Sequence, residues 1–196
     1  IDLTRLTYER RRMTTFAQSV SMATVSFPYP LRRLTLTRTF PALPFVPGDP
    51  QEQAARCEEI LSIQAAGLAR RLAHTGSGAV IGLSGGLDSA LALLVTARAY
   101  DALGRSRSDI RAVTMPCFGT TDRTRSNSHR LAQAVGASLT EISIAETVSL
   151  HLRDIGHGGA HDVTYENAQA RERTQVLMDI ANQDGALVIG TGDLSE

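Results

Sequence analysis

The chain has 196 residues, of which 42% are hydrophobic and 20% are charged, a balance that is ordinary for a globular α/β protein. Its formal net charge is zero, so no global attraction favours a nucleic acid or a membrane as a partner. No apolar stretch approaches the ~20 residues that cross a bilayer, and no early apolar segment indicates a signal peptide. Cys57 and Cys117 are too few for a disulfide framework, so we expect a cytoplasmic protein with two buried thiols.

The first 46 residues differ from the rest in charge, because they carry seven arginines against two acidic residues. A helix is expected over about residues 2–17. Prolines then break any long element up to Pro50, leaving short strand-like pieces at 25–27 and 34–36. This part is typical of an extended connector laid over a surface.

An amphipathic helix is predicted from Gln51 to about His74, stopped by the Thr-Gly-Ser-Gly sequence at 75–78. Four of its side chains are expected to face a core: Ile60, Leu61, Leu68 and Leu72.

After this helix, apolar strands alternate with helical segments. The expected elements are a strand at 79–83, a helix at 88–103, a strand at 110–115, a helix at 122–135, a strand at 138–142, helices at 145–153 and 165–183, and a strand at 186–190. This alternation predicts a doubly wound parallel sheet of the α/β class. The last predicted strand, at 186–190, is followed only by a polar loop and not by a helix that would cover it. The sheet is therefore interpreted as incomplete, as if the chain were cut at both ends.

Ligands of such sheets bind beyond the carboxyl ends of the strands. Polar clusters follow three strand ends, at 84–89, 116–125 and 191–196, and we expect them to converge on one crevice. The middle cluster suits a contact with an adenine or a ribose. Cys117 within it has no histidine nearby in sequence, so it is not interpreted as a nucleophile.

The segment from Gly82 to Ser89 reads Gly-Leu-Ser-Gly-Gly-Leu-Asp-Ser and joins the first strand to a helix. Glycines let the backbone approach a phosphate, and the first amides of a helix lack internal partners. Asp88 would repel a phosphate unless a hard cation such as Mg²⁺ bridges the two. The loop is not a Walker A motif, which requires a lysine, because all 20 basic residues of the chain are arginines. The alternative is a tight turn that binds nothing.

This loop resembles the pyrophosphate loop of the N-type ATP pyrophosphatases, which cleave ATP between the α- and β-phosphates. Two further clusters are open to a functional and a structural interpretation. Asp193 and Glu196 could face Asp88 across a magnesium site, or could form a helix cap and its capping-box partner. Asn167 and Arg171, spaced i,i+4 on one helix face, could hold a polar ring substituent or a phosphate, or could be a solvated surface.

Two other polar features lie in the same part of the chain. Arg173 falls on a different helix face from Arg171. A glycine-rich segment between the last two helices carries two histidines and two aspartates. Its irregular spacing and lack of thiolates favour a mobile loop near the substrate over a zinc site. The residues concerned are Asp154, His157, His161 and Asp162.

Together these clusters resemble one family, the glutamine-dependent NAD synthetases. The resemblance rests on the segments 45–50, 63–69, 84–89, 115–124, 165–171 and 190–196. It implies an adenine nucleotide α-hydrolase-like sheet and a two-step reaction. The carboxylate of deamido-NAD attacks the α-phosphate of Mg-ATP, and ammonia then displaces AMP to give NAD.

The resemblance also implies roles for individual residues. ATP would be bound by Gly82, Leu83, Ser84, Gly85, Gly86, Leu87, Asp88, Ser89 and Thr191. Deamido-NAD would be bound by Asn167, Arg171 and Glu196. Mg²⁺ would be held by Asp88 and Glu196.

By the same resemblance, residues 1–50 are the tail of an upstream nitrilase-like glutaminase domain plus a connector, and residues 51–196 begin the synthetase domain. The glutaminase would supply ammonia from glutamine, and its catalytic residues would lie upstream. We expect a homo-oligomer, and a chain that is catalytically incomplete by itself. Cys117 stands where glycine is common, and the loop around Gly158 looks shortened. The alternatives are another ATP pyrophosphatase such as GMP synthetase, or a non-catalytic docking piece.

Overall fold

The computed structural model describes residues 3–13, 15, 23–28, 30, 33, 35, 37, 39–40 and 42–191. Its contacts divide the chain into two units, Ile1–Pro44 and Phe45–Glu196. This division reflects contacts between residues, whereas the boundary at residue 50 was predicted from the family resemblance. The assignment of residues 1–50 to the tail of a glutaminase domain stays a prediction.

The first unit contains helix α1 (Leu3–Arg12), which has no buried residue. It is shorter than predicted, because Met13 is already non-helical where β-branched threonines of low helix propensity begin. The strand-like piece expected at 25–27 has no regular secondary structure. Most of the other piece, at 34–36, lies outside the described residues.

The second unit is built on a four-stranded parallel sheet. Its strands are β1 (Gly78–Gly82), β2 (Ile110–Thr114), β3 (Ser138–Glu141) and β4 (Ala186–Ile189), in the spatial order β3-β2-β1-β4. The predicted parallel α/β sheet is confirmed. The chain runs outward from β1 to β3 and then returns to the other side of β1. The loops after β1 and β4 therefore diverge, which places a topological switch point between these strands.

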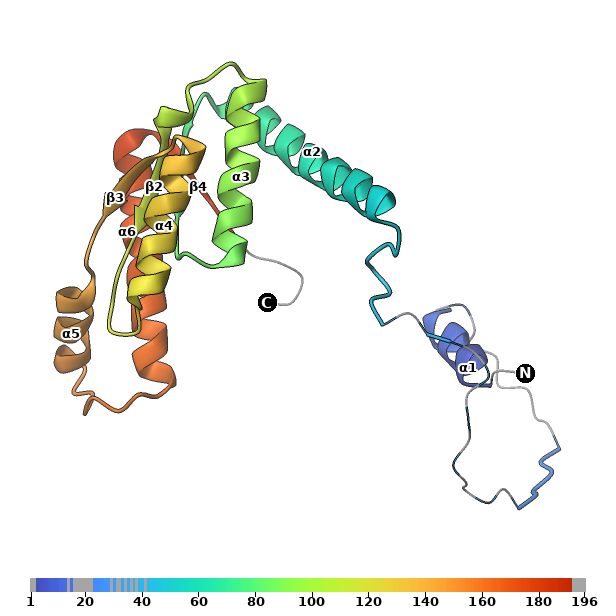
Figure 1. Ribbon diagram of the computed structural model, residues 1–196. Helices are drawn as coiled ribbons and strands as arrows, with labels where there is room; N and C mark the ends of the chain where they lie inside the picture. The colour runs from blue at the N-terminus through green and yellow to red at the C-terminus, as the bar shows by residue number, and fades with distance from the viewer. Residues whose placement is uncertain are drawn as a thin grey trace. The chain divides into compact units, whose positions relative to one another are not determined.

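Helices cover both faces of the sheet (Figure 1). Helices α3 (Leu87–Ala102) and α4 (Asp122–Val135) lie on one face, with α2 (Pro50–Thr75) packed against α3. Helices α5 (Ala145–Asp154) and α6 (Val163–Asp184) lie on the other face. A 3₁₀ turn, Arg107–Asp109, leads into β2.

Each face of the sheet buries its own apolar cluster, as the twofold alternation of strands requires. In β1, Ala79 and Ile81 join the cluster under α3 and α4, whereas Val80 joins the cluster under α5 and α6. In β2, Ala112 and Val113 divide in the same way. Because both faces are buried, the central strands are largely apolar, as the sequence indicated, and the charged Arg111 of β2 is paired with Asp184.

Helix α2 has well-defined ends. The Asp49 carboxylate accepts hydrogen bonds from the backbone N–H of Gln51 at 2.6 Å and of Glu52 at 3.1 Å, and Pro50 occupies the first turn. At the other end Gly76 adopts a left-handed φ of 69° and donates its N–H to the Leu72 carbonyl at 3.0 Å. The predicted stop at 75–78 is therefore confirmed.

The buried face of α2 is only partly the one predicted. Leu72 is fully buried and Leu61 and Leu68 are half-buried, but Ile60 is 49% exposed, so its assignment to the core is wrong. Two small residues, Ala65 and Ala69, provide the rest of the buried stripe, where short side chains permit close approach of α3. The expectation of two buried thiols is also half wrong, because Cys57 is exposed and Cys117 is buried. Within the part of the chain that the structure describes, every helix is too short or too polar to span a bilayer.

Truncation of Leu72 tests this orientation of α2. Leu72→Ala is expected to lower the free energy of unfolding by about 2–5 kcal/mol, because it leaves a cavity beneath a fully buried side chain. Ile60→Ala is the matched control and should cost less than about 1 kcal/mol, since its side chain is half exposed. Urea unfolding followed by circular dichroism measures both. Equal losses would contradict the orientation described above.

Candidate functional site

The loop between β1 and α3 is braced by its own serines. The Ser89 hydroxyl, only 4% exposed, donates to the Gly86 carbonyl at 3.1 Å and lies 3.1 Å from the Ser84 hydroxyl. The Ser84 hydroxyl accepts the N–H of Gly86 at 3.2 Å, and the Ser89 hydroxyl accepts the N–H of Ser84 at 3.3 Å. Ser89 therefore shapes the loop from inside, whereas Ser84, Gly86 and Asp88 are exposed at its surface.

The amino terminus of α3 lacks a side-chain cap, as does that of α5, whereas α2, α4 and α6 each have one. Asp49, Thr121 and Asp162 each accept backbone N–H groups at the starts of α2, α4 and α6. At the start of α3 the capping position is Gly86, with no side-chain hydrogen bond. The first amides of α3 and the positive end of its dipole are thus available to an external anion.

Gly85 sits where no other residue fits. Its φ is 81°, which L side chains rarely adopt. A Cβ atom there would overlap the Thr124 carbonyl oxygen and lie 3.0 Å from the carbonyl carbon. The loop is therefore in direct backbone contact with the first turn of α4.

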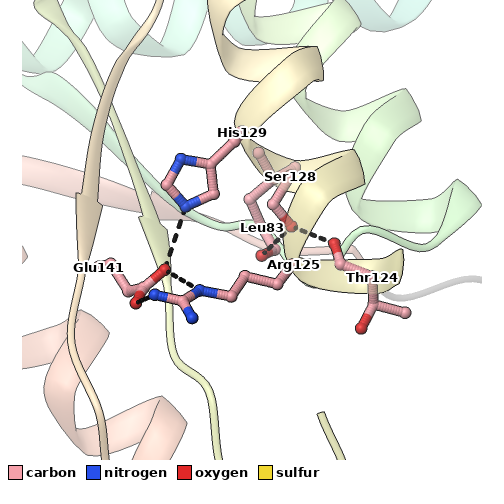
Figure 2. A network of polar contacts seen from close by, with 6 residues as sticks. All are labelled: Leu83, Thr124, Arg125, Ser128, His129 and Glu141. Atoms are coloured by element: carbon pink, nitrogen blue, oxygen red, sulfur yellow. Dashed lines mark hydrogen bonds and ion pairs between the residues drawn. The ribbon is translucent and has the colours of Figure 1, made fainter. Parts of the chain in front are cut away.

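Helix α4 holds the loop through a polar network that Figure 2 shows. The Ser128 hydroxyl is fully buried and donates to the carbonyl of Leu83 at 3.1 Å, with the Thr124 carbonyl at 3.2 Å as its other acceptor. On the outer side of α4, Glu141 at the end of β3 accepts hydrogen bonds from Nε (2.8 Å) and Nη2 of Arg125. His129 Nε2 lies 3.0 Å from Glu141 Oε2. Bonding to Arg125, and then to His129, lowers the pKa of the Glu141 carboxyl.

A cavity of about 500 Å³ opens beyond the carboxyl ends of β1 and β2, a size typical of small-ligand sites. One wall is the loop after β1, and the other is the segment after β2 that the sequence assigned to an adenine or ribose contact. Apolar side chains predominate in the lining, and Arg173 of α6 is its one charged residue among those the structure describes. The lining residues are Gly82, Leu83, Ser84, Val113, Thr114, Met115, Pro116, Gly119, Thr120, Thr124, Arg173 and Leu177.

A second cavity, of about 240 Å³, lies between α2, α3 and the end of β4. Asp88 and Thr191 both line it, together with Gln64 of α2. The structure thus brings together two of the predicted site residues from different strand ends. The rest of the final cluster, including Asp193 and Glu196, lies outside the described residues. The polar clusters border two cavities rather than the single crevice expected.

A third cleft, of about 870 Å³, runs along the outer side of the loop between α3 and α4. Gly85 and Gly86 form one side, and Arg123 and Arg130 of α4 lie on the other. This cleft exposes the loop glycines to solvent from the side opposite the 500 Å³ cavity.

Two of the residues predicted to bind deamido-NAD are not at these cavities. Asn167 and Arg171 lie on an exposed face of α6 and line none of the three cavities, and Glu196 lies outside the described residues. Arg173, which the sequence placed on another face, is the arginine of this helix that lines the 500 Å³ cavity beside the loop. Its spacing of four residues before the sheet-facing Leu177 was the signal that could have identified it.

The histidine-containing segment has structural partners of its own. His157 Nε2 is 3.1 Å from the Asp162 carboxylate, which also caps α6 by accepting the N–H groups of Thr164 and Tyr165. His161 stacks on the Tyr165 ring, with centroids 4.4 Å apart. Within the described residues, no three histidine, cysteine or acidic side chains converge as a metal site.

Substitution of Gly85 tests the contact between the loop and α4. Gly85→Ala is expected to displace the loop and weaken Mg-ATP binding at least about 10-fold, because the new methyl group overlaps the Thr124 backbone. Gly76→Ala is the matched control. Its φ of 69° is also left-handed, but nothing lies within 4 Å, so it should cost about 1 kcal/mol of stability and leave binding unchanged. Isothermal titration and thermal unfolding measure the two effects, and normal binding by Gly85→Ala would refute the contact.

The lowered pKa of Glu141 predicts a defined pH dependence. A carboxyl whose pKa is lower in the folded state stabilises the fold above its unfolded pKa, near 4.5, and this contribution is lost as the pH falls through the lowered value. The difference in melting temperature between wild type and Glu141→Gln should therefore be largest above about pH 4.5 and shrink below it. A difference independent of pH would contradict the ion-paired state of Glu141.

Comparison with known proteins shows which family the chain resembles. A family model described as NAD synthase matches residues 62–196. A glutamine-dependent NAD(+) synthetase of Mycobacterium leprae is 50% identical over 173 residues, covering 85% of this chain and 25% of the relative. The glutamine-dependent NAD(+) synthetase of Mycobacterium tuberculosis (strain ATCC 25618 / H37Rv) is 42% identical over 212 residues. This match covers 100% of this chain and 31% of the relative. This chain thus spans 25% and 31% of the lengths of these curated relatives.

Among solved structures, a glutamine-dependent NAD+ synthetase from Acinetobacter baumannii in complex with adenosine diphosphate matches with a TM-score of 0.64 and 32% identity. The match covers 71% of this chain and 26% of that one. The fold of this chain therefore has a counterpart in a protein of the same description. Because the family model matches more than half of the sequence, this chain belongs to the NAD synthase family.

Proposed function

We propose that this chain is the first part of the synthetase domain of a glutamine-dependent NAD synthetase, an ATP-dependent ligase that amidates deamido-NAD. The observation that carries the proposal is the uncapped amino terminus of α3 behind the Ser-Gly-Gly loop, in a chain of the NAD synthase family. The relatives of this description are three to four times longer, so the complete enzyme would include further segments. The proposed partners are an upstream glutaminase domain and a second copy of the chain in the cytoplasm.

The chemistry requires two displacements. A carboxylate oxygen of deamido-NAD attacks the α-phosphorus of ATP, the bond to the bridging oxygen breaks, and pyrophosphate leaves with the electron pair. The nitrogen of ammonia then attacks the activated acyl carbon, AMP leaves, and the nitrogen loses a proton to give the amide. The first step develops negative charge on the departing pyrophosphate, which the amides at the start of α3 are placed to stabilise.

The proposal keeps the residue roles that the family resemblance implies. The segment from Gly82 to Ser89 and Thr191 would bind ATP, with Ser89 acting by shaping the loop. Asn167, Arg171 and Glu196 would bind deamido-NAD. The exposed position of Asn167 and Arg171 is compatible with a substrate that approaches α6 from outside the cavities.

The residues near Asp88 fit a magnesium ion. Among the described residues the Asp88 carboxylate has no ion pair, and the Thr191 side chain lines the same cavity. Carboxylate and hydroxyl oxygens are the hard ligands that Mg²⁺ prefers, and Glu196 would add a second carboxylate. When bound, the ion would offset the charge of the ATP phosphates.

The family match supports deamido-NAD over the substrate of GMP synthetase, which the loop alone left open. A docking role without turnover receives no support from the loop, because its amides and Asp88 are exposed for binding. Deamido-NAD is therefore the substrate to test first.

The test uses the gene product extended to its natural termini, with Mg-ATP, deamido-NAD and either ammonium or glutamine. NAD and AMP are expected in equal amounts from both nitrogen sources, as followed by mass spectrometry. Asp88→Ala should lower turnover at least about 100-fold by removing a metal ligand. Asp179→Ala, at an exposed position of α6, is the matched control and should remain active.

Two outcomes would contradict the proposal. AMP formed only when xanthosine monophosphate replaces deamido-NAD would mean that the substrate is wrong and the ATP site right. Full activity of Asp88→Ala would exclude its role in holding magnesium.

A further inference from the structure

Arg173 differs from the other partly buried arginines of the fold. Arg111 pairs with Asp184 at 2.6 Å, Arg98 pairs with Glu58, and Arg105 donates to a backbone carbonyl. Arg173 is half-buried, yet among the described residues it makes no ion pair and no hydrogen bond. A guanidinium that loses hydration without gaining a partner is unfavourable, so the position calls for an anion from outside the chain.

The packing of α6 sets where this side chain points. Leu177 contacts β1 so closely that a Cβ on Gly82 would lie 2.9 Å from its Cδ1 atom. Arg173 lies one turn earlier on the same helix face. Side chains lean towards the amino terminus of their helix, and α6 runs antiparallel to the strands it connects. The guanidinium therefore extends beyond the carboxyl ends of β1 and β2, into the 500 Å³ cavity.

The cavity contains nothing on the protein to neutralise Arg173. Its described lining includes no aspartate or glutamate, and the opposite wall is Ser84 and the start of the phosphate loop. The charge of Arg173 and the open amides of α3 therefore attract an anion to the same corner of the sheet. The rest of the lining, including Val113, Met115 and Leu177, is apolar and suits the flat face of a base.

We propose that Arg173 binds the α-phosphate of ATP and of the adenylated intermediate, an assignment that rests on the proposed function. With the nucleoside in the apolar part of the cavity and the pyrophosphate at the start of α3, the phosphate at their junction is the α-phosphate. A planar guanidinium can donate to two of its non-bridging oxygens at once. As the carboxylate oxygen attacks and pyrophosphate departs, Arg173 stabilises the charge on these oxygens.

Binding of AMP and of adenosine tests this contact directly, using the full-length gene product. Arg173→Gln should bind AMP at least about 10-fold more weakly and adenosine as wild type does, since only AMP carries the phosphate. Arg173→Lys keeps the positive charge but loses the planar guanidinium with its two parallel donors. Its affinity for AMP should therefore lie between those of wild type and Arg173→Gln. Arg70→Gln, an exposed arginine of α2, is the matched control and should leave both affinities unchanged.

Deamido-NAD-dependent exchange of labelled pyrophosphate into ATP isolates the first chemical step. Arg173→Gln should lower the kcat of this exchange about 100-fold, the usual cost of one lost transition-state donor, with partial recovery in Arg173→Lys. A purely structural role would lower the folded fraction but would leave the ratio of AMP to adenosine affinity unchanged.

The outcomes separate the two proposals. The role of Arg173 would be overturned, even if NAD is formed, if Arg173→Gln weakened the binding of AMP and of adenosine equally. It would also be overturned if this variant weakened the binding of neither ligand. If wild type binds AMP and ATP but shows no exchange with deamido-NAD, the proposed function fails while the binding ratio still decides the phosphate contact. If circular dichroism shows that Arg173→Gln is poorly folded, the ratio of AMP to adenosine affinity in Arg173→Lys tests the phosphate contact instead.

Discussion

The backbone contact between Gly85 and Thr124 is the constraint on which the candidate site depends. A loop that binds a phosphate, the role proposed for this one, must present its amides in one arrangement. Gly85 of this loop is pressed against the first turn of α4 with no room for a Cβ atom. The buried Ser128 hydroxyl bonds the same turn to the Leu83 carbonyl at the end of β1. The loop is thus positioned by a neighbouring helix as well as by its own serines.

This dependence extends across the sheet to its far edge. On the outer side of helix α4, Arg125 and His129 make polar contacts with the carboxylate of Glu141, which belongs to β3. β3 pairs with β2, and β2 pairs with β1, from which the loop emerges. A chain of contacts therefore joins the edge strand to the anion site. Such rigid support from regular elements keeps a binding loop in one geometry.

The charges around the loop are separated in space. Arg173 borders the cavity over β1 and β2, whereas Asp88 borders the cavity beside β4. The open amides of α3 begin between these two cavities. A polyphosphate laid along the loop would meet the Arg173 guanidinium at one end and the Asp88 carboxylate, for which we propose a magnesium-binding role, at the other. The strand order, in which β1 separates β2 from β4, produces this separation.

The regular elements and the chemistry of the loop could be predicted from the sequence, because both depend on local patterns. The bounds of helix α4 were predicted to the residue, and the glycines and serines of 82–89 indicated an anion site without any tertiary information. Which side chains meet depends on the tertiary structure. Arg173 reaches the cavity while Arg171 does not, Ile60 is exposed, and Ser89 turns inward, because these outcomes depend on how closely neighbouring elements pack and on strand order, which helical periodicity does not specify.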